Sequence, residues 1–535
     1  SIDWGDDQFN NNVTSNITHT YANPGVYTVS IIGTYPAIGH NELSGDAYKL
    51  TFIDQWGTQV WQTMSEAFAG CENMEYRATD IPNLTAVTDM NSMFLLCRKF
   101  NGNINSWNVS NVTTMSALFG VNDIYNQPLD NWDVGKVTRM NLMFFRTNEF
   151  NQNIGNWNTS KVTTMSRMFE DARAFNQPLI TWNVSSVTAI DKMFQRAIAF
   201  NQPLNNWNVS AAKDMTSMFN GAEVFNQNID AWDVENVENM TSMFLDASVF
   251  NEPVNSWNVS QVKSMRAMFS NARSFNQPLN NWNVTLVNNM ANMFVSALTF
   301  NQNINSWNVT NVADMQSMFS NATMFNQPLN TWDVNSVVNM SSMFQRASVF
   351  NQPLDDWDVS AVANMTSMFE SAILFNQPLN NWDVSSVTLM KSMFEGATIF
   401  NQNLNTWNVG VVTTMEEMFK NAPAFNEPLN NWNTGEVLNM KEMFSGASVF
   451  NQNINSWNTS FVRTMEEMFK DARAYNQTMD SWNVASVTTM KGTFQGATAF
   501  NGTMDNWNVR RVSTMENMFS GATSFNQTIN SWRVN

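Results

Sequence analysis

Apolar and polar positions along this chain repeat with a period of 25 residues. Tryptophan stands at Trp107 and at every twenty-fifth position after it as far as Trp532, with no insertion between them. An aromatic residue opens each unit, from Phe100 to Phe525, and an asparagine follows it every time. The unit reads F-N-x-x-L-x-x-W-x-V-x-x-V-x-x-M-x-x-M-F-x-x-A-x-x. A period this regular predicts a solenoid, in which each unit packs only on its neighbours.

The first half of the unit has the spacing of a strand. Leu204, Trp207 and Val209 give the L-x-x-W-x-V pattern of the strand half of a leucine-rich-repeat-like unit. Proline recurs just before the leucine, as at Pro203. Because proline cannot donate to a ladder of backbone hydrogen bonds, we expect one short strand that begins after it.

The second half of the unit has helical spacing. Val112, Met115, Phe119 and Asn122 differ by three, four and three positions, which is one face of a helix of about ten residues. Ser110 lies where an N-cap would be. The predicted fold class is therefore an α/β repeat solenoid of the leucine-rich-repeat type, with one short strand and one short helix in each 25-residue coil. We expect about nineteen coils over residues 61–535, and a small β cap formed by residues 1–60.

Composition and charge exclude several classes of function. The chain has 27 Lys and Arg against 45 Asp and Glu, a net charge of −18. This balance argues against binding to nucleic acid or to anionic membranes, because both need a basic surface. With two histidines and two cysteines, no metal or histidine-based catalytic site can recur along the repeat. No apolar run reaches the length of about 18 residues that a membrane span needs, so we expect no membrane insertion.

Three repeated columns have both a functional and a structural interpretation. The asparagine after each opening aromatic is either a polar binding ladder or an internal ladder, and its full occupancy favours the internal one. The methionine pair, for example Met215 and Met218, lies at helical spacing beside phenylalanine and therefore indicates core rather than a metal or redox site. The tryptophan column could stack sugars if it were exposed. It follows the inward pattern, so we expect burial.

The variable chemistry lies in the exposed slots of the predicted strand. These slots carry mostly asparagine and aspartate, which gives a neutral-to-acidic polar face. Such a face would suit weak, repeated contacts with glycans, or calcium bridging between aspartates, and its simplest interpretation is a solvated surface. The candidate positions are Asn108, Asp133, Asn158, Asn183, Asn208, Asp233, Asp333, Asp358 and Asp383.

Cys71 and Cys97 each stand three residues after a phenylalanine, where later units have alanine. Both should therefore occupy a small buried position in adjacent coils. Strand spacing of about 4.8 Å lies within reach of a disulfide, so the pair is either a disulfide or two buried thiols. No catalytic cysteine motif surrounds either residue. Aspartates cluster at Asp355, Asp356 and Asp358, but they fall in slots that asparagine fills elsewhere, which makes a hydrolase site the weakest option.

The repeat resembles the BspA-like leucine-rich-repeat surface proteins, in the group whose units read FNQPLNNWNVSNVTNMSSMF. The resemblance extends over residues 62–535. Residues 3–33 resemble the second half of a polycystic-kidney-disease-type (PKD-like) β-sandwich module, through Trp4-Gly5-Asp6 and His19-Thr20-Tyr21. The resemblance implies a secreted or cell-surface bacterial protein that adheres to matrix, cells or other surfaces and is not an enzyme.

Two functions therefore remain open from the sequence. The first is a surface adhesion or structural protein without a cofactor, which binds extracellular protein or glycan ligands. The second is a carbohydrate-recognition module of a larger secreted protein. The final unit ends at a predicted edge strand in which Arg533 is the single charged residue and Val534 is the last apolar residue. This edge predicts head-to-tail self-association into a filament.

Overall fold

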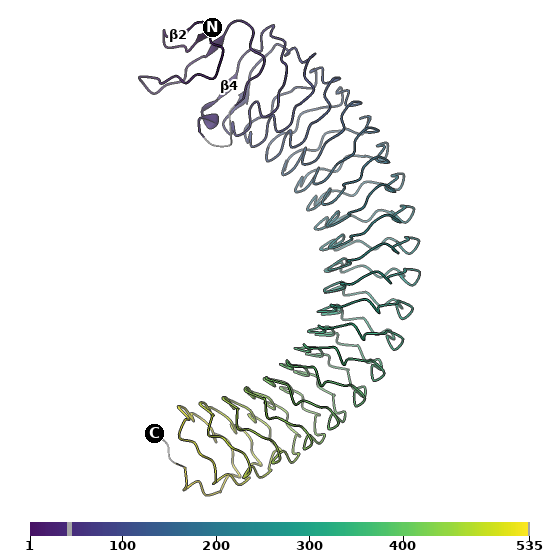
Figure 1. The fold of residues 1–535 in the computed structure, drawn as a ribbon, viewed down its shortest axis with the longest axis vertical. Helices are drawn as coiled ribbons and strands as arrows, with labels where there is room; N and C mark the ends of the chain where they lie inside the picture. The colour runs from purple at the N-terminus through teal and green to yellow at the C-terminus, as the bar shows by residue number, and fades with distance from the viewer. Residues whose placement is uncertain (40–44, 533–535) are drawn as a thin grey trace. The chain divides into compact units, whose positions relative to one another are not determined.

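The computed structural model describes residues 1–39 and 45–532. The chain forms two compact units, Ser1–Ala212 and Lys213–Asn535. Within each unit, successive 25-residue coils lie side by side in chain order (Figure 1). The predicted repeat solenoid is confirmed for each unit taken by itself.

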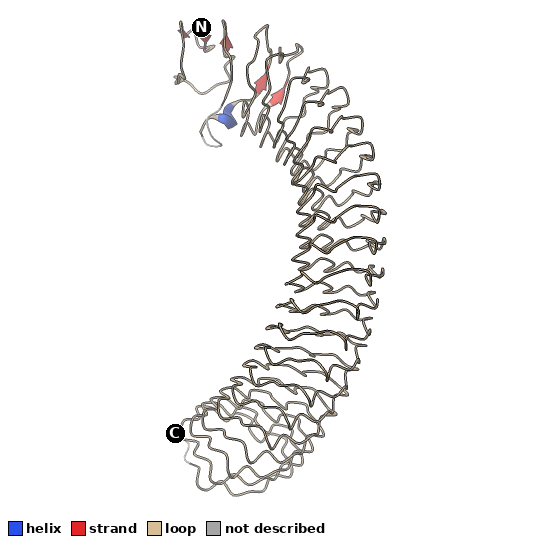
Figure 2. Ribbon diagram, turned by 45° about the vertical axis from the view of Figure 1, so that its right-hand side comes forward, coloured by secondary structure: helices blue, strands red, loops and turns tan. Residues whose placement is uncertain are grey.

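Regular secondary structure is confined to the start of the described chain (Figure 2). Three two-residue strands form an antiparallel sheet in the order β2-β1-β3, and a second pair of strands is parallel. The elements are β1 (Ile2–Asp3), β2 (Phe9–Asn10), β3 (Ser30–Ile31), the 3₁₀ helix η1 (Ala47–Lys49), β4 (Phe52–Ile53) and β5 (Glu75–Tyr76).

The stack of coils includes residues that precede the first complete repeat. Strand β4 pairs in parallel with β5, with Phe52 opposite Glu75. Trp56 is buried, and its indole donates a hydrogen bond to the Tyr76 hydroxyl at 3.0 Å. The backbone N–H of Gln62 donates to the carbonyl of Pro36 at 2.8 Å, which ties the residues before the repeat to the coil that follows them.

The predicted helix of each coil is replaced by a chain of tight turns, so this part of the prediction is wrong. Met218, Asn220 and Ala222 each donate their backbone N–H to the carbonyl three residues back, at 3.0–3.2 Å. The N–H groups that alternate with these donate outside their own coil. Those of Ser217 and Phe219 donate to carbonyls of the next coil at 2.9 Å. An α-helix keeps its N–H groups inside its own segment, whereas this ribbon shares every second one with its neighbour.

The backbone dihedrals explain why no helix forms there. Ser217 has a φ of 55° and Gly221 a φ of 70°, and the equivalent positions of other coils are left-handed as well. A left-handed residue at the third position is typical of a type II turn and ends a right-handed helix. The apolar spacing of three, four and three fits two linked turns as well as it fits a helix turn. The sequence pattern alone therefore could not separate them.

The predicted strand half is irregular too. Trp307 donates its backbone N–H to the Ile304 carbonyl at 3.1 Å, which is a turn and not an extended pair. The isolated parallel bridges between coils of the second unit, such as Asn239 to Ser264 and Ser264 to Asn289, lie at the start of the linked turns and not in the predicted strand half. Stacking, rather than regular strands, holds neighbouring coils in register.

The aromatic and methionine columns form the core, as predicted. Trp307 is 2% exposed, and its ring lies 6.4 Å from that of Trp332 with an interplanar angle of 4°. The Trp307 Nε1 donates to the Leu279 carbonyl of the preceding coil at 2.9 Å, so burial leaves no orphan donor. Phe294 and Phe300 stack at 4.0 Å within the coil. Each buried tryptophan removes roughly 150–250 Å² from water, which explains the strict period.

The asparagine column is the internal ladder that the sequence favoured. Asn276 donates its backbone N–H to the Asn251 Oδ1 at 2.9 Å, and Asn276 Oδ1 in turn accepts from the Asn301 backbone at 2.9 Å. Gln302 Nε2 also donates to Asn276 Oδ1, at 2.9 Å. Each side chain thus bonds the backbone of the next coil. Full occupancy reflects a structural requirement.

The predicted C-terminal edge lies partly beyond the described part of the chain. Phe525 and Trp532 are half-buried. Trp532 still donates its Nε1 to the Met504 carbonyl at 3.2 Å. Arg533 and Val534 lie outside the described residues, so head-to-tail association stays a prediction.

Candidate functional site

The candidate polar face occupies one position of the coil. All nine predicted residues are exposed, and in each the side-chain Oδ1 accepts the backbone N–H two residues later. These bonds, at 3.0–3.2 Å, form an Asx turn that fixes the direction of the side chain. The nine residues are Asn108, Asp133, Asn158, Asn183, Asn208, Asp233, Asp333, Asp358 and Asp383.

The structure groups these positions by unit. Five of them fall in five successive coils of the first unit, from Asn108 to Asn208, and four lie in the second unit, at Asp233 and in three successive coils from Asp333 to Asp383. One side chain per coil makes a single file rather than a pocket. Each file therefore offers repeated, equivalent polar groups at the spacing of the coils.

Two carboxylates of this face, Asp358 and Asp383, are held in the charged form. Hydrogen bonds from the Ser360 hydroxyl and backbone hold the pKa of Asp358 below its usual value. The hydroxyl lies 2.6 Å from the carboxylate oxygen. Bonds from Ser385 lower the pKa of Asp383 in the same way. A hydrogen bond that favours the ionised form lowers a carboxyl pKa, so these aspartates carry negative charge at neutral pH.

The candidate polar face offers calcium too few oxygen ligands at any one place. Within residues 1–39 and 45–532 no group of three or more His, Cys, Asp or Glu side chains is arranged to hold a metal ion. The aspartates come one to a coil, whereas calcium takes six to eight oxygen ligands. Calcium bridging thus has no cluster to support it.

The two cysteines are thiols in the structure, and both are buried. The Cys97 Sγ donates to the Phe68 carbonyl at 3.0 Å. Burial raises the pKa of Cys71 to about 12 and raises that of Cys97 well above its ordinary value. Of the two alternatives from the sequence, the structure has the buried thiols and not the disulfide. Buried thiols with raised pKa values are poor nucleophiles.

The aspartates around residue 355, which gave the weakest candidate for a hydrolase site, take part in the repeat structure. Asp355 Oδ1 accepts the Asn381 backbone N–H at 3.0 Å, and Asp358 is committed to its own turn. Asp355 therefore occupies the same structural role that asparagine has in other coils, where Asn405 Oδ1 accepts from the Asn431 backbone at 2.9 Å. No acid–base pair set apart from the repeat emerges at this place.

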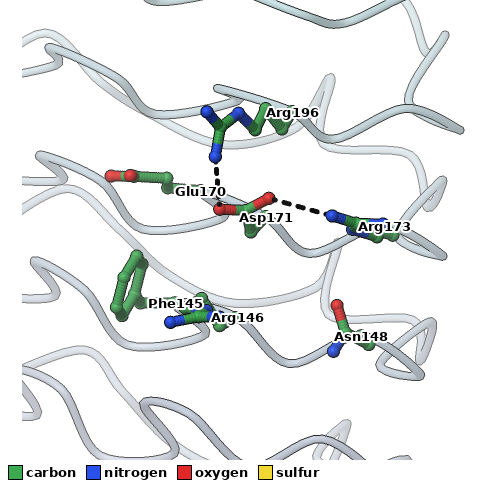
Figure 3. A pocket seen from close by; sticks show the side chains of 7 residues that line it. All are labelled: Phe145, Arg146, Asn148, Glu170, Asp171, Arg173 and Arg196. Carbon is green, nitrogen blue, oxygen red and sulfur yellow. Dashed lines mark hydrogen bonds and ion pairs between the residues drawn. The ribbon is translucent and has the colours of Figure 1, made fainter.

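A surface that the sequence reasoning missed lies on the linked turns of the first unit. A cavity of about 550 Å³ is lined by residues of three successive coils (Figure 3). The cavity contains three arginines, which we call the arginine cluster: Arg146, Arg173 and Arg196. They surround Asp171, whose carboxylate lies 3.8 Å from Arg173 Nη2 and 3.5 Å from Arg196 Nη1. The signal in the sequence was the alternation of Arg146, Asp171 and Arg196 at one repeat position.

The same turn surface carries a second charged group in the second unit. Lysine and glutamate alternate at one coil position, in a column that we call the lysine–glutamate ladder: Lys391, Glu416, Lys441, Glu466, Lys491 and Glu516. Beside this column, Lys420 Nζ lies 2.8 Å from Glu417 Oε1, 2.5 Å from Glu442 Oε2 and 3.9 Å from Glu395 Oε1. Burial opposes the charge of Lys420, but the carboxylates of Glu417 and Glu442 outweigh it and raise the pKa of the lysine.

Comparison with known families identifies the repeat. A family model described as "Mycoplasma protein of unknown function, DUF285" matches residues 62–179, 119–229, 204–302, 276–379, 351–455 and 439–535. The chain belongs to this family. Its six overlapping matches follow the repeat that the sequence predicted. The matches of this DUF285 protein begin at residue 62, and the PKD-like resemblance of residues 3–33 is not supported. No curated protein sequence matches the chain.

Solved structures that resemble the chain are distant. A leucine-rich repeat protein from Bacteroides ovatus has 11% identity and a TM-score of 0.25, covering 86% of this chain and 84% of its own. A leucine-rich cell surface protein from Faecalibacterium prausnitzii has 11% identity and a TM-score of 0.22, covering 79% and 83%. The Toll–Spatzle complex of Drosophila has 9% identity and a TM-score of 0.22, covering 82% and 58%. These superpositions are too loose for any argument to rest on them.

A search of the described helices for a membrane span finds none that is long and apolar enough to cross a bilayer.

Proposed function

We propose that this DUF285 protein is a non-catalytic, secreted or cell-surface repeat protein that adheres to matrix, cells or other subunits by extended multivalent contacts. The observation that carries the proposal is the candidate polar face, whose side chains are exposed at one position of successive coils and are held in one direction by their own turns. Each contact on such a face is weak. Repetition raises the overall affinity without a deep pocket.

The chemistry of the polar face also supports a second function, that of a carbohydrate-recognition module in a larger secreted protein. Asn258, Asn283 and Asn308 are exposed at the same coil position as the nine residues of the candidate polar face. In Asn308 the turn occupies Oδ1, which accepts the Thr310 backbone N–H at 3.2 Å. The amide nitrogen is then available to donate to a ligand hydroxyl, and in Asp358 the second carboxylate oxygen can accept one. Donors and acceptors in single file match the hydroxyls along a glycan chain.

A face variant tests both functions. Aspartate stands at this position in Asp333 and Asp358 and makes the same turn, so an asparagine-to-aspartate change preserves the fold. It removes the amide donor and adds a charge. We expect the triple variant to lose about tenfold or more in adhesion, because several weak contacts fail together. The variant is Asn258→Asp, Asn283→Asp, Asn308→Asp.

A matched control makes the same chemical change in a different column. Aspartate occurs naturally in that column at Asp130 and Asp355, and the altered side chains are exposed. The control variant is Asn280→Asp, Asn330→Asp, Asn430→Asp. Equal adhesion of wild type and face variant to matrix-coated surfaces would contradict the proposal, as would an equal loss in the control.

A glycan array with the purified chain separates the two functions. Adhesion to deglycosylated matrix with an empty array supports the adhesion protein. Binding to defined glycans, weakened by the face variant and not by the control, supports the carbohydrate-recognition module. The array and the adhesion assay should use the same protein preparations, so that a folding defect appears in both.

A further inference from the structure

The arginine cluster holds uncompensated positive charge in an acidic protein. Glu170 is already bound bidentately by Arg167, with Nε at 2.5 Å from Oε2 and Nη2 at 3.2 Å from Oε1. Asp171 is thus the one carboxylate of the cavity left to face Arg146, Arg173 and Arg196. Three guanidinium groups against one carboxylate leave a local excess of two positive charges, although the whole chain carries −18.

The pairs that Asp171 makes are long, and the one with Arg196 uses a single donor of its guanidinium group. Charge-assisted N–H···O bonds are typically about 2.7–2.9 Å long, whereas Asp171 lies 3.8 Å from Arg173 and 3.5 Å from Arg196. The Asp171 side chain is 11% exposed, while those of Arg173 and Arg196 are 59% and 61% exposed. The carboxylate is therefore a buried anchor. The guanidinium forks keep donors available to a ligand.

The stacking of the coils sets the spacing of the cluster. Arg146, Asp171 and Arg196 occupy one left-handed position in three successive coils, with φ values of 55°, 56° and 56°. Equivalent rings of these coils, Phe144 and Phe169, lie 5.6 Å apart. Arg146 and Arg196 are thus separated by two coil spacings, or about 11 Å along the stack, with Arg173 to one side (Figure 3).

The cavity also has a short apolar side. The half-buried Phe145 ring lines it next to Arg146, and the Arg167 guanidinium lies 5.2 Å from the centre of that ring. Asn148 lines the other side. An aromatic ring beside arginine side chains and an amide suits a sugar ring that carries an oxyanion. The C–H groups of the sugar pack against the aromatic ring, and the oxyanion accepts two parallel N–H bonds from a guanidinium group.

We propose that the arginine cluster is a binding site for an anionic saccharide that bears a sulfate or carboxylate group. The oxyanion contacts the exposed guanidinium forks of Arg146 and Arg196 on the solvent side of the buried Asp171 carboxylate, and Arg173 supplies a third contact. The ligand is short, because a long polyanion would be repelled by the acidic remainder of the chain. The site lies on the linked turns rather than on the candidate polar face. It does not depend on the proposed function.

The test is calorimetric titration of the full chain with a sulfated disaccharide and with its desulfated counterpart. Wild type should bind the sulfated form, bind the desulfated form at least about tenfold more weakly, and lose affinity as salt rises. The double variant Arg146→Ala, Arg196→Ala should weaken binding by about tenfold or more, since it removes two charge-assisted bonds. The double variant Arg146→Lys, Arg196→Lys retains the charge and loses the fork, so it should fall between the two.

The second unit offers a matched control. Arg346 occupies the same coil position as Arg146, and its backbone N–H donates to Glu370 as that of Arg146 donates to Glu170. Arg273 occupies the coil position of Arg173. Neither has a second arginine at the adjacent positions of the neighbouring coils. The control variant Arg273→Ala, Arg346→Ala makes the same charge change and should bind like wild type.

Four results would overturn the proposal. They are no binding by wild type, equal loss in the control variant, equal affinity for free sulfate and the sulfated disaccharide, and tighter binding of a short glutamate peptide than of the disaccharide. The second shows a general charge effect, the third removes the saccharide, and the fourth assigns the cluster to acidic peptides. Hydrogen exchange around Asp171 in each variant shows that the cavity is still folded.

Discussion

The arginine cluster and the lysine–glutamate ladder lie on the same linked turns of the coil and use charge in opposite ways. In the ladder, lysine pairs with glutamate of the next coil where Lys391 lies 3.1 Å from Glu416 and where Lys491 lies 3.7 Å from Glu516. In the cluster, Arg173 and Arg196 share the Asp171 carboxylate, and Arg146 lines the same cavity. One surface neutralises itself, and the other keeps donors for a ligand. The repeat thus fixes the backbone, and a few exposed substitutions decide whether a coil binds or only stacks.

The largest expected effect tests whether both surfaces share one scaffold. Two variants test this: Trp157→Ala in the first unit, which holds the arginine cluster, and Trp307→Ala in the second unit. Each removes a side chain that is only 2–3% exposed and a hydrogen bond from Nε1 to a carbonyl at 2.9–3.0 Å. Each should lower the free energy of unfolding of its coils by about 3–5 kcal/mol. Hydrogen exchange should rise in the adjacent coils and little elsewhere, because coupling runs between nearest neighbours.

The two tryptophan variants also check each other. Similar losses would show that the scaffold is equivalent under both charged surfaces. A much smaller loss at Trp157 would mean that the coils near the cluster are held differently. Uniform loss of protection along the whole chain in either variant would contradict local coupling.

The next largest effect separates a self-neutralised charge from an available one. Lys420→Met keeps most of the apolar stem but leaves Glu395, Glu417 and Glu442 facing one another with no lysine between them. The Lys420 side chain is 23% exposed and that of Glu442 is 14% exposed, so water replaces the lost partner poorly. We expect a local loss of about 1–2 kcal/mol by denaturant-dependent hydrogen exchange. Arg196→Met, at 61% exposure, should change stability by less than about 0.5 kcal/mol.

This pair of variants has a clear contrary outcome. If Arg196→Met destabilises as much as Lys420→Met, the arginine is a structural partner of Asp171 and not a donor kept for a ligand. Adding Glu417→Gln to Lys420→Met should recover part of the loss, because it removes one of the repelling charges.

The sequence predicts the repeat, its core and its asparagine ladder because each depends on burial at a fixed period. Trp307 and Met315 are buried for the reason that their spacing indicated. The secondary structure inside the coil is not predictable in the same way. Left-handed residues at Ser217 and Ser242 turn a helical apolar spacing into linked turns, and serine gives no local signal for that conformation. The arginine cluster is visible only when successive repeats are aligned, because Arg146, Asp171 and Arg196 lie 25 residues apart and come near one another only when the coils stack.

A smaller effect compares the response of the two surfaces to salt. Screening weakens the attraction between Lys420 and its glutamates and weakens the repulsion among Arg146, Arg173 and Arg196. Raising the salt concentration should therefore speed hydrogen exchange around residues 416–442 and slow it around residues 146–196. Bulk unfolding would average the two, so the measurement needs peptide resolution. A change of the same sign at both surfaces would show that the cluster carries no net repulsion.

The smallest expected effect applies the same comparison within the polar face, between a charged and a neutral turn. The Ser360 hydroxyl and backbone hold the pKa of Asp358 below its usual value, so the ionised form is the one that stabilises the turn. That stabilisation is fully present above the unfolded-state pKa of about 3.9 and is lost as the pH falls through the lower folded-state pKa. Asn308 makes the same turn with the Thr310 backbone at 3.2 Å and does not titrate.

Carboxyl-resolved NMR titration should give Asp358 a pKa below that of an ordinary aspartate, and acid should speed exchange of the Ser360 amide but not of the Thr310 amide. Ser360→Ala should raise the Asp358 pKa only part of the way, because the backbone bond remains. An ordinary Asp358 pKa, or equal acid sensitivity of the two turns, would show that the charge does not hold this face in place.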